Sequence, residues 1–102
     1  MTSELVRRLG ERMRTMAEIG ADPDGGITRL AYTELERAAH RRFADWASED
    51  GARCETDPAG NTVAVYREGT PYFLVGSHLD TVVRGGAFDG VAGVIGAMEV
   101  AR

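Results

Sequence analysis

The segment from Gly76 to Gly90, GSHLDTVVRGGAFDG, brings one histidine and two aspartates together in the sequence. In an extended segment, side chains two residues apart point the same way, so His78 and Asp80 are expected on one side of the chain. A histidine that binds a metal through one ring nitrogen usually donates its other N–H to a carboxylate, which fixes the tautomer and orientation of the ring. Asp80 is placed to be that carboxylate, or to bind a metal itself.

The second aspartate, Asp89, follows His78 after a loop that contains the pair Gly85-Gly86. Because these glycines allow the loop to fold tightly, we expect Asp89 to face His78 across a small gap. One carboxylate can bridge two divalent ions about 3.5–4 Å apart, an arrangement common in two-metal hydrolases. Asp89 is therefore the candidate bridging ligand of a binuclear metal site.

Each of these residues also has an interpretation without a metal. Asp89 could be only the N-cap of the helix that follows it. His78 could be an ordinary polar residue at a strand end, and Asp80 could form an Asx-type turn with Thr81. The combination of His78, both aspartates and the glycines favours the metal site. The other histidine, His40, has no nearby acid-rich partner in the sequence and is expected to be structural or solvated.

Two helices are predicted ahead of this segment. Apolar residues at helical spacing predict an amphipathic helix over residues 3–19, which the turn-forming run at 20–26 ends. Its solvated face is expected to carry four arginines, namely Arg7, Arg8, Arg12 and Arg14. The capping-box pair Thr33 and Glu36 begins a second helix that ends before Gly51. The core face of this helix is expected to comprise Leu35, Ala39, Phe43 and Trp46.

The periodicity then changes to that of strands. Short runs at 53–57 and 62–67 flank the turn Pro58-Ala59-Gly60-Asn61, and a third run, Tyr72-Phe73-Leu74-Val75, is apolar throughout. A strand without polar alternation is typical of the centre of an α/β sheet, where both faces are covered. Residues 90–102 are apolar nearly all round and predict a buried helix. The fold class is thus α/β, in the order helix–helix–strand–strand–strand–helix.

Composition excludes several classes of protein. The 102 residues allow one small domain, and the net charge of −4 provides no global positive field to attract nucleic acid or an anionic membrane. No apolar run approaches the roughly eighteen residues needed to span a bilayer, and the N-terminus lacks the apolar block of a signal peptide. The expected location is the cytoplasm. The single cysteine, Cys54, cannot form an internal disulfide and is expected to be a small buried hydrophobe.

The stretch GSHLDTVVRGGAFDGVAGV resembles the M20 metallopeptidases, a superfamily of zinc-dependent aminopeptidases, deacylases and amidohydrolases. Two further segments, GGITRLAYT at 25–33 and DPAGN at 57–61, together with GGAFDG at 85–90 within the stretch, resemble its hydantoinase/carbamoylase branch. That branch holds the N-carbamoyl-L-amino acid hydrolases, β-ureidopropionases and allantoate amidohydrolases. The resemblance covers residues 5–102 and implies part of a zinc-aminopeptidase-like, three-layer α/β/α sandwich. Residues 1–102 would be the N-terminal part of the metal-dependent catalytic domain.

The resemblance also implies roles for individual residues. His78 would bind one metal, Asp89 would bridge both, and Asp80 would orient His78 in catalysis. The peptide bond after Asp89 would be cis, with Gly90 reducing its steric cost. The cofactors would be two divalent ions, zinc first and manganese, cobalt or nickel as alternatives, which supply hydroxide near neutral pH for attack on an amide or ureido carbonyl.

Several catalytic parts of the family have no counterpart in the sequence. A general-base glutamate, the metal-binding glutamate beside it and two further histidines come later in the family, and Glu99 has no adjacent acid that would assign it this role. The lid domain through which the family forms homodimers is also absent. Since a zinc site needs at least three protein ligands per ion, three groups cannot hold two ions, and the isolated chain is expected to be inactive.

The leading functional hypothesis is an N-terminal fragment of a cytoplasmic amidohydrolase that hydrolyses N-carbamoyl amino acids or related ureido compounds. An enzymatic rival is a peptidase or N-acyl deacylase of the same superfamily. A rival without catalysis is a module that binds an anion or nucleotide at the helix start, residues 89–93. It lacks the usual phosphate-loop patterns, and Asp89 would repel a phosphate. A third interpretation is a truncated product or one half of a split enzyme.

Overall fold

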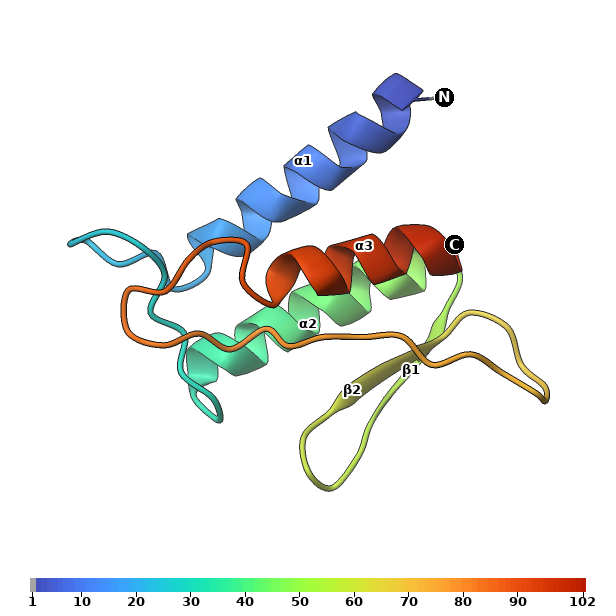
Figure 1. Ribbon diagram of the computed structural model, residues 1–102. Helices are drawn as coiled ribbons and strands as arrows, with labels where there is room; N and C mark the ends of the chain where they lie inside the picture. The colour runs from blue at the N-terminus through green and yellow to red at the C-terminus, as the bar shows by residue number, and fades with distance from the viewer. Residues whose placement is uncertain (1) are drawn as a thin grey trace.

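The computed structural model describes residues 2–102, which form three helices and one two-stranded sheet (Figure 1). In chain order the elements are α1 (Thr2–Glu18), α2 (Glu34–Glu49), β1 (Arg53–Thr56), β2 (Thr62–Val65) and α3 (Val91–Ala101). The α/β class is confirmed, and all three predicted helices form close to their predicted ends. None of the helices in this described range is both long and apolar enough to cross a membrane.

Helix α2 begins and ends with the predicted residues. The Thr33 side chain accepts a hydrogen bond from the Glu36 amide at 3.3 Å, as an N-cap does. The Glu36 carboxylate accepts from the Tyr32 amide at 2.8 Å, one residue earlier than in the standard capping box. Beyond the helix, Gly51 adopts a φ of +95°, the conformation expected just past a helix end. Leu35, predicted to lie in the core, is instead 45% exposed.

The prediction that the arginines of the first helix are solvated is wrong for two of them. Arg12 is buried, with its guanidinium 5.2 Å from the centre of the Trp46 ring and 3.3 Å from the Asp50 carboxylate. Arg8 donates two hydrogen bonds of 2.6 and 2.7 Å to Glu99 and so links α1 to α3. Both arginines find carboxylates outside their own helix, which the spacing of residues within one helix cannot reveal.

Strands β1 and β2 form an antiparallel hairpin in which Arg53 pairs with Val65 and Thr56 pairs with Thr62. The connecting turn is held by the Asp57 carboxylate, which accepts hydrogen bonds of 2.9 Å from the amides of Ala59 and Asn61. These bonds and the Asn61 side chain, whose effect is the largest, lower the pKa of Asp57 from its ordinary value. The turn predicted here is therefore confirmed.

The third predicted strand does not form. Residues 72–75 have no regular structure, and all four side chains are exposed, Phe73 fully so. A central strand needs a neighbouring strand on each edge for its backbone hydrogen bonds. The sheet formed within residues 2–102 contains only β1 and β2, so this apolar segment has no pairing partner. The three-layer sandwich that the third strand would belong to stays a prediction.

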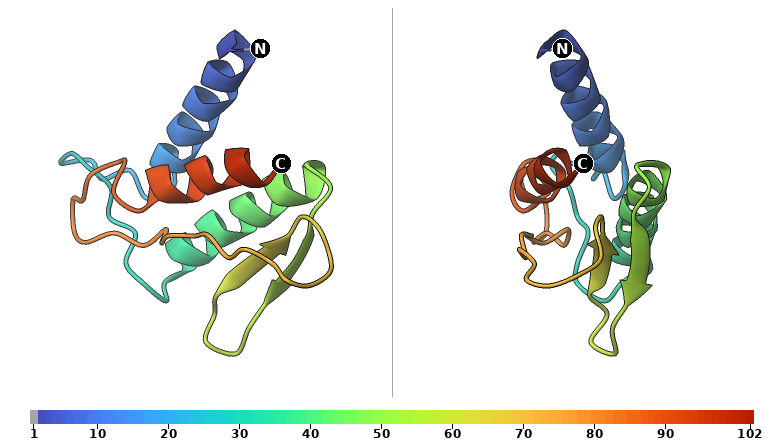
Figure 2. Two further views of the ribbon diagram at one scale, coloured as in Figure 1. Left: turned by 45° about the vertical axis from the view of Figure 1, so that its right-hand side comes forward. Right: turned by 90° about the vertical axis from the view of Figure 1, so that its right-hand side faces the viewer.

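The hydrophobic core lies between the helices and reaches into the loop that follows residue 75. Helix α3 packs on α1, while the hairpin lies against α2, as both views of Figure 2 show. The main buried cluster contains residues from all three helices and from this loop. Its members are Met16, Ala39, Leu79, Val91, Val94 and Ile95. Because Leu79 belongs to this cluster, the core fixes the segment that carries His78 and Asp80.

Candidate metal centre

The candidate site lies on the loop of residues 76–90, called here the His78 loop, which precedes α3. Leu79 and Thr81 are buried, at 5% and 7% exposure, whereas His78 is exposed and Asp80 is partly exposed. This alternation is that of an extended segment, in which residues two apart share a side. The predicted placement of His78 and Asp80 on one side is consistent with it.

The His78 loop is held in place by residues 27–29, part of the GGITRL segment. Ile27 and Gly85 exchange two backbone hydrogen bonds of 2.9 and 2.7 Å. The amide of Arg29 donates to the Thr81 hydroxyl at 2.9 Å, and the Thr81 amide donates to the Arg29 carbonyl at 2.8 Å. Two separate points of the loop are therefore fixed to one segment that lies far away in the sequence.

The two ring nitrogens of His78 face different aspartates. Its Nδ1 lies 3.0 Å from the carbonyl oxygen of Asp80 and 3.3 Å from Oδ1 of the same residue. A carbonyl oxygen only accepts, so Nδ1 carries the proton in this hydrogen bond. In this tautomer Nε2 has a free lone pair, and Nε2 lies 3.9 Å from Oδ2 of Asp89. The arrangement matches that of a metal-binding histidine oriented through its other nitrogen.

Asp89 does not act as the N-cap of α3. The N-cap position is occupied by Gly90, so α3 has no side-chain cap. The Asp89 side chain is 80% exposed. Within residues 2–102, the Asp80 carboxylate accepts no backbone hydrogen bond, and Thr81 instead donates its hydroxyl to the Ile27 carbonyl at 2.8 Å. Neither the capping role nor the Asx-type turn therefore explains these two aspartates.

Gly90 packs directly against the His78 ring. A Cβ atom at this position would lie 2.6 Å from both Nδ1 and Cε1 of His78, and φ is +74°. The predicted cis bond after Asp89 is wrong, because the only cis peptide within residues 2–102 joins Thr70 to Pro71. The chain enters α3 through the positive φ of Gly90, which only glycine adopts without strain.

The distance between His78 and Asp89 is compatible with a shared metal ion. Zinc–nitrogen and zinc–oxygen bonds are about 2.0–2.2 Å long, so one ion can link two ligand atoms only when these lie within about 4.3 Å. The separation of 3.9 Å is inside that limit. No group of three or more potential ligands converges within the described part of the chain, residues 2–102. His78 and Asp89 are thus close enough to share one ion, but the described residues do not form a complete ligand set.

His40 lies apart from this site and has a structural role, as predicted. Its Nδ1 is 2.7 Å from the Thr62 hydroxyl, which ties α2 to β2. Its Nε2 is 3.6 Å from the Glu36 carboxylate one helical turn earlier, so the prediction that it lacks an acidic partner is wrong. Burial is the main cause that lowers the pKa of His40, Arg37 lowers it further, and Glu36 partly offsets both.

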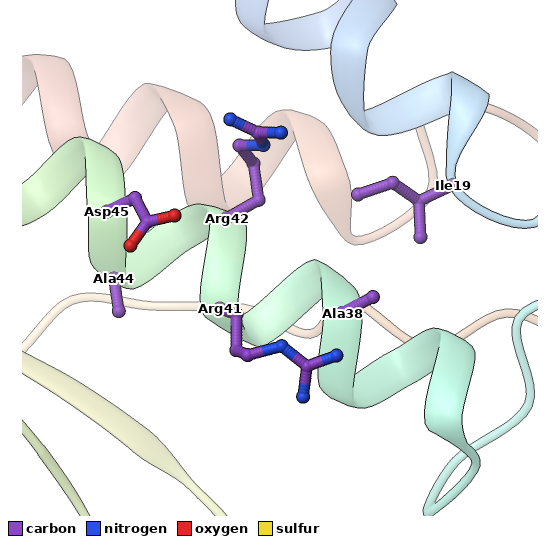
Figure 3. A pocket seen from close by; sticks show the side chains of 6 residues that line it. All are labelled: Ile19, Ala38, Arg41, Arg42, Ala44 and Asp45. Atoms are coloured by element: carbon purple, nitrogen blue, oxygen red, sulfur yellow. The ribbon is translucent and has the colours of Figure 1, made fainter.

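A hollow elsewhere on the surface does not contribute to the site. It is lined by Ile19, Ala38, Arg41, Arg42, Ala44 and Asp45, none of which belongs to the His78 loop. Figure 3 shows that the Arg41 and Arg42 side chains extend in opposite directions from α2. The two guanidinium groups therefore do not converge on one anion, and the hollow does not include residues 89–93, where the anion-binding alternative was predicted.

One residue of the site's surroundings was missed by the sequence reasoning. Arg29 is 1% exposed and donates a hydrogen bond of 2.7 Å to the carbonyl oxygen of Leu79, between His78 and Asp80. The sequence does contain a signal for it: Arg29 is the single charged residue of the GGITRL segment and stands between the apolar residues Ile27 and Leu30. A charged side chain flanked in this way is buried only when several hydrogen bonds compensate it.

Comparison with known proteins identifies amidohydrolases as relatives. The chain is 42% identical over 99 residues to the N-carbamoyl-L-amino acid amidohydrolase of Geobacillus stearothermophilus, covering 93% of this chain and 24% of the relative. It is 36% identical over 86 residues to the allantoate amidohydrolase of Bacillus subtilis, covering 81% of this chain and 21% of the relative. No family model matches the chain.

Solved structures give the same answer. A hydantoinase/carbamoylase family amidase from Burkholderia ambifaria superposes with a TM-score of 0.86 at 42% identity, covering 93% of this chain and 24% of that one. A second, from Burkholderia phymatum, has a TM-score of 0.85 at 33% identity. The chain thus spans about a quarter of the length of the relatives that it matches. Over that span, in sequence and in fold, it belongs to the hydantoinase/carbamoylase family of amidases.

Proposed function

We propose that the chain supplies His78, Asp80 and Asp89 to the binuclear metal centre of an amidohydrolase that acts on N-carbamoyl amino acids or related ureido compounds. The family relationship supports a hydrolase of linear amides. The observation that carries the metal proposal is the His78 ring, whose Nδ1 is engaged by Asp80 while Nε2 lies 3.9 Å from Asp89. A histidine held in this way presents one lone pair in a fixed direction.

Each residue has a distinct task in this proposal. Asp80 holds the His78 ring through Nδ1 and keeps it in one tautomer. His78 offers Nε2, and Asp89 offers two carboxylate oxygens that are open to solvent. When bound, a pair of divalent ions lowers the pKa of a water molecule, so that hydroxide is available near neutral pH. Zinc suits imidazole and carboxylate ligands, with manganese, cobalt and nickel as alternatives.

The remaining parts of the proposed centre are assigned to a longer polypeptide. The relatives are about four times as long as the matched segment, because that segment makes up 24% of their length. We propose that this further length supplies the other ligands and the general base, and also a lid through which the complete enzyme forms homodimers. The isolated chain is proposed to be inactive, because His78, Asp80 and Asp89 do not complete two zinc sites.

A chimaera tests the function. The matched 99-residue segment of the Geobacillus stearothermophilus amidohydrolase is replaced by this chain, and ammonia release from an N-carbamoyl-L-amino acid is measured. Activity in the chimaera, lost in its His78→Ala and Asp89→Asn variants but kept in Asp45→Asn, supports the proposal. Asp45 is a suitable control because it is exposed on α2, away from the His78 loop. A folded chimaera whose activity does not depend on His78 and Asp89 would contradict it.

The same chimaera distinguishes the proposed carbamoyl hydrolase from the alternative enzyme, a peptidase or N-acyl deacylase. Hydrolysis of a carbamoyl group yields the amino acid, carbon dioxide and ammonia, whereas hydrolysis of an acyl or peptide bond releases no ammonia from a ureido group. Cleavage restricted to N-acyl amino acids or dipeptides would therefore favour a deacylase or peptidase. The names of the relatives, carbamoyl amino acid and allantoate amidohydrolases, favour the ureido substrates.

A further inference from the structure

Arg29 is a buried cation that is held by carbonyl oxygens. Its side chain is 1% exposed and donates to three of them: Leu79 at 2.7 Å through Nε, and Met16 at 2.9 Å and Ile19 at 2.6 Å through one terminal nitrogen. Within residues 2–102 it forms no ion pair, unlike the other buried arginine, Arg12, which pairs with Asp50. Burial of this charge therefore depends on hydrogen bonds with a fixed geometry.

One of these acceptors, Met16, lies in the last turn of α1, and another, Ile19, directly follows the helix. Helix C-termini leave carbonyl groups without partners and carry partial negative charge, so they favour a cation. The last turn of α1 contains no basic residue of its own. Arg29 provides the missing cation from another segment, and in doing so anchors its guanidinium to a rigid element.

The third acceptor lies inside the candidate site. The Leu79 carbonyl belongs to the peptide that joins Leu79 to Asp80, and the next carbonyl, that of Asp80, accepts the hydrogen bond from the His78 ring. Rotation of the Leu79–Asp80 peptide would move the Asp80 carbonyl and release the ring. The bond from Arg29 resists that rotation. The backbone of Arg29 adds two hydrogen bonds to Thr81 on the other side of Asp80.

We infer that Arg29 is a positioning residue of the proposed metal centre, because it connects the end of α1 to the peptide between His78 and Asp80 and so fixes the direction of the His78 Nε2 lone pair. The inference rests on the proposed function, because the direction of the lone pair matters only when His78 binds a metal ion. Its geometric part, the control of the His78 ring by Arg29, can be tested without any metal.

The first test compares two variants that each replace a buried arginine, Arg29→Lys and Arg12→Lys. Lysine keeps the charge but lacks the planar fork that reaches several acceptors at once. In metal-free protein, ¹⁵N spectra of the imidazole report whether His78 stays in one tautomer. We expect R29K to lose the Nδ1-protonated tautomer pattern and R12K, which does not contact the His78 loop, to keep it. A folded R29K variant with the wild-type pattern would overturn the inference.

The second test titrates the same proteins with Zn²⁺ alone and follows the His78 signals. We expect R29K to bind Zn²⁺ about 10-fold more weakly than wild type, the usual loss when a group that orients a ligand is removed. R12K should match wild type. If wild type does not bind Zn²⁺ at His78 while R29K still alters the ring, the metal proposal fails and the positioning role stands. Equal Zn²⁺ affinity in folded R29K and wild type overturns the role of Arg29.

A reciprocal measurement covers the case in which R29K does not fold. The His78→Ala variant changes an exposed position and leaves the Arg29 side chain intact. We expect it to shift the Nε–H resonance of Arg29, which donates to the neighbouring Leu79 carbonyl, and to leave that of Arg12 unchanged. An unmoved Arg29 resonance would show that the ring and the guanidinium are independent, contrary to the inference.

Discussion

Nε2 of His78 lies 3.9 Å from Oδ2 of Asp89, although the two residues are at opposite ends of one loop. The approach results from contacts outside the pair. The backbone bonds between Ile27 and Gly85 close the middle of the loop, and the absence of a side chain at Gly90 lets its end pack on the His78 ring. The pair is therefore arranged by backbone contacts, and its two side chains remain open to a ligand.

The first prediction concerns Asp89→Asn. Because the Asp89 side chain is 80% exposed and does not cap α3, the free energy of unfolding should change by no more than about 0.5 kcal/mol. Binding of Zn²⁺ at His78 should weaken, since an amide is a poorer metal ligand than a carboxylate. Thermal denaturation and a Zn²⁺ titration measure the two effects. A folded variant with unchanged Zn²⁺ binding would contradict a role for Asp89 as a metal ligand.

The second prediction compares alanine at two glycines with positive φ. Gly51→Ala should cost about 1–2 kcal/mol, because a Cβ there meets nothing within 4 Å and only backbone strain remains. Gly90→Ala should cost more, because the added Cβ would also lie 2.6 Å from the His78 ring. Chemical denaturation measures both losses. Equal losses, with unchanged His78 NMR signals in the Gly90 variant, would mean that the loop end and the ring are not in contact.

Local sequence patterns were sufficient to predict the helices and to place His78 and Asp80 on the same side of the chain. Helical spacing and the Thr33 cap place α1 and α2, and the two-residue period places His78 beside Asp80. Two of the failures, the missing third strand and the unexpected burial of Arg12, have a common cause, which is dependence on distant partners. The segment at 72–75 needs neighbouring strands, and Arg12 needs the Asp50 carboxylate from the end of α2. Neither partner is visible in the local sequence pattern.

The third prediction follows from the exposed apolar segment. Phe73→Asp should change the free energy of unfolding by at most about 0.5 kcal/mol, because the side chain is fully exposed. It should also reduce binding of a hydrophobic dye to the protein, since the segment at 72–75 exposes four apolar side chains. Met98→Ala is the matched control in a buried position and should cost about 2–5 kcal/mol. A comparable loss in both variants would show that Phe73 is packed in solution, as the predicted central strand required.

The fourth prediction is a pH dependence caused by the contact between α1 and α3. Two hydrogen bonds from Arg8 lower the pKa of Glu99 from its ordinary value of 4.5. A carboxylate whose pKa is lowered by folding stabilises the folded state above the pKa of the unfolded chain, and this contribution is lost as the pH falls through the lower, folded pKa. The free energy of unfolding should therefore decrease on acidification below the ordinary value of 4.5.

Glu99→Gln should flatten this part of the stability curve, because glutamine does not titrate and cannot form the charged pair with Arg8. Glu11→Gln is the control: its exposed pair with Arg7 on the same helix should contribute little. Denaturant unfolding at several pH values measures all three proteins. The expected order is a steep acid decline for wild type and Glu11→Gln, and a shallower one for Glu99→Gln. If Glu99→Gln declined as steeply as wild type, other carboxylates would govern the acid stability and the α1–α3 contact would not depend on this ion pair.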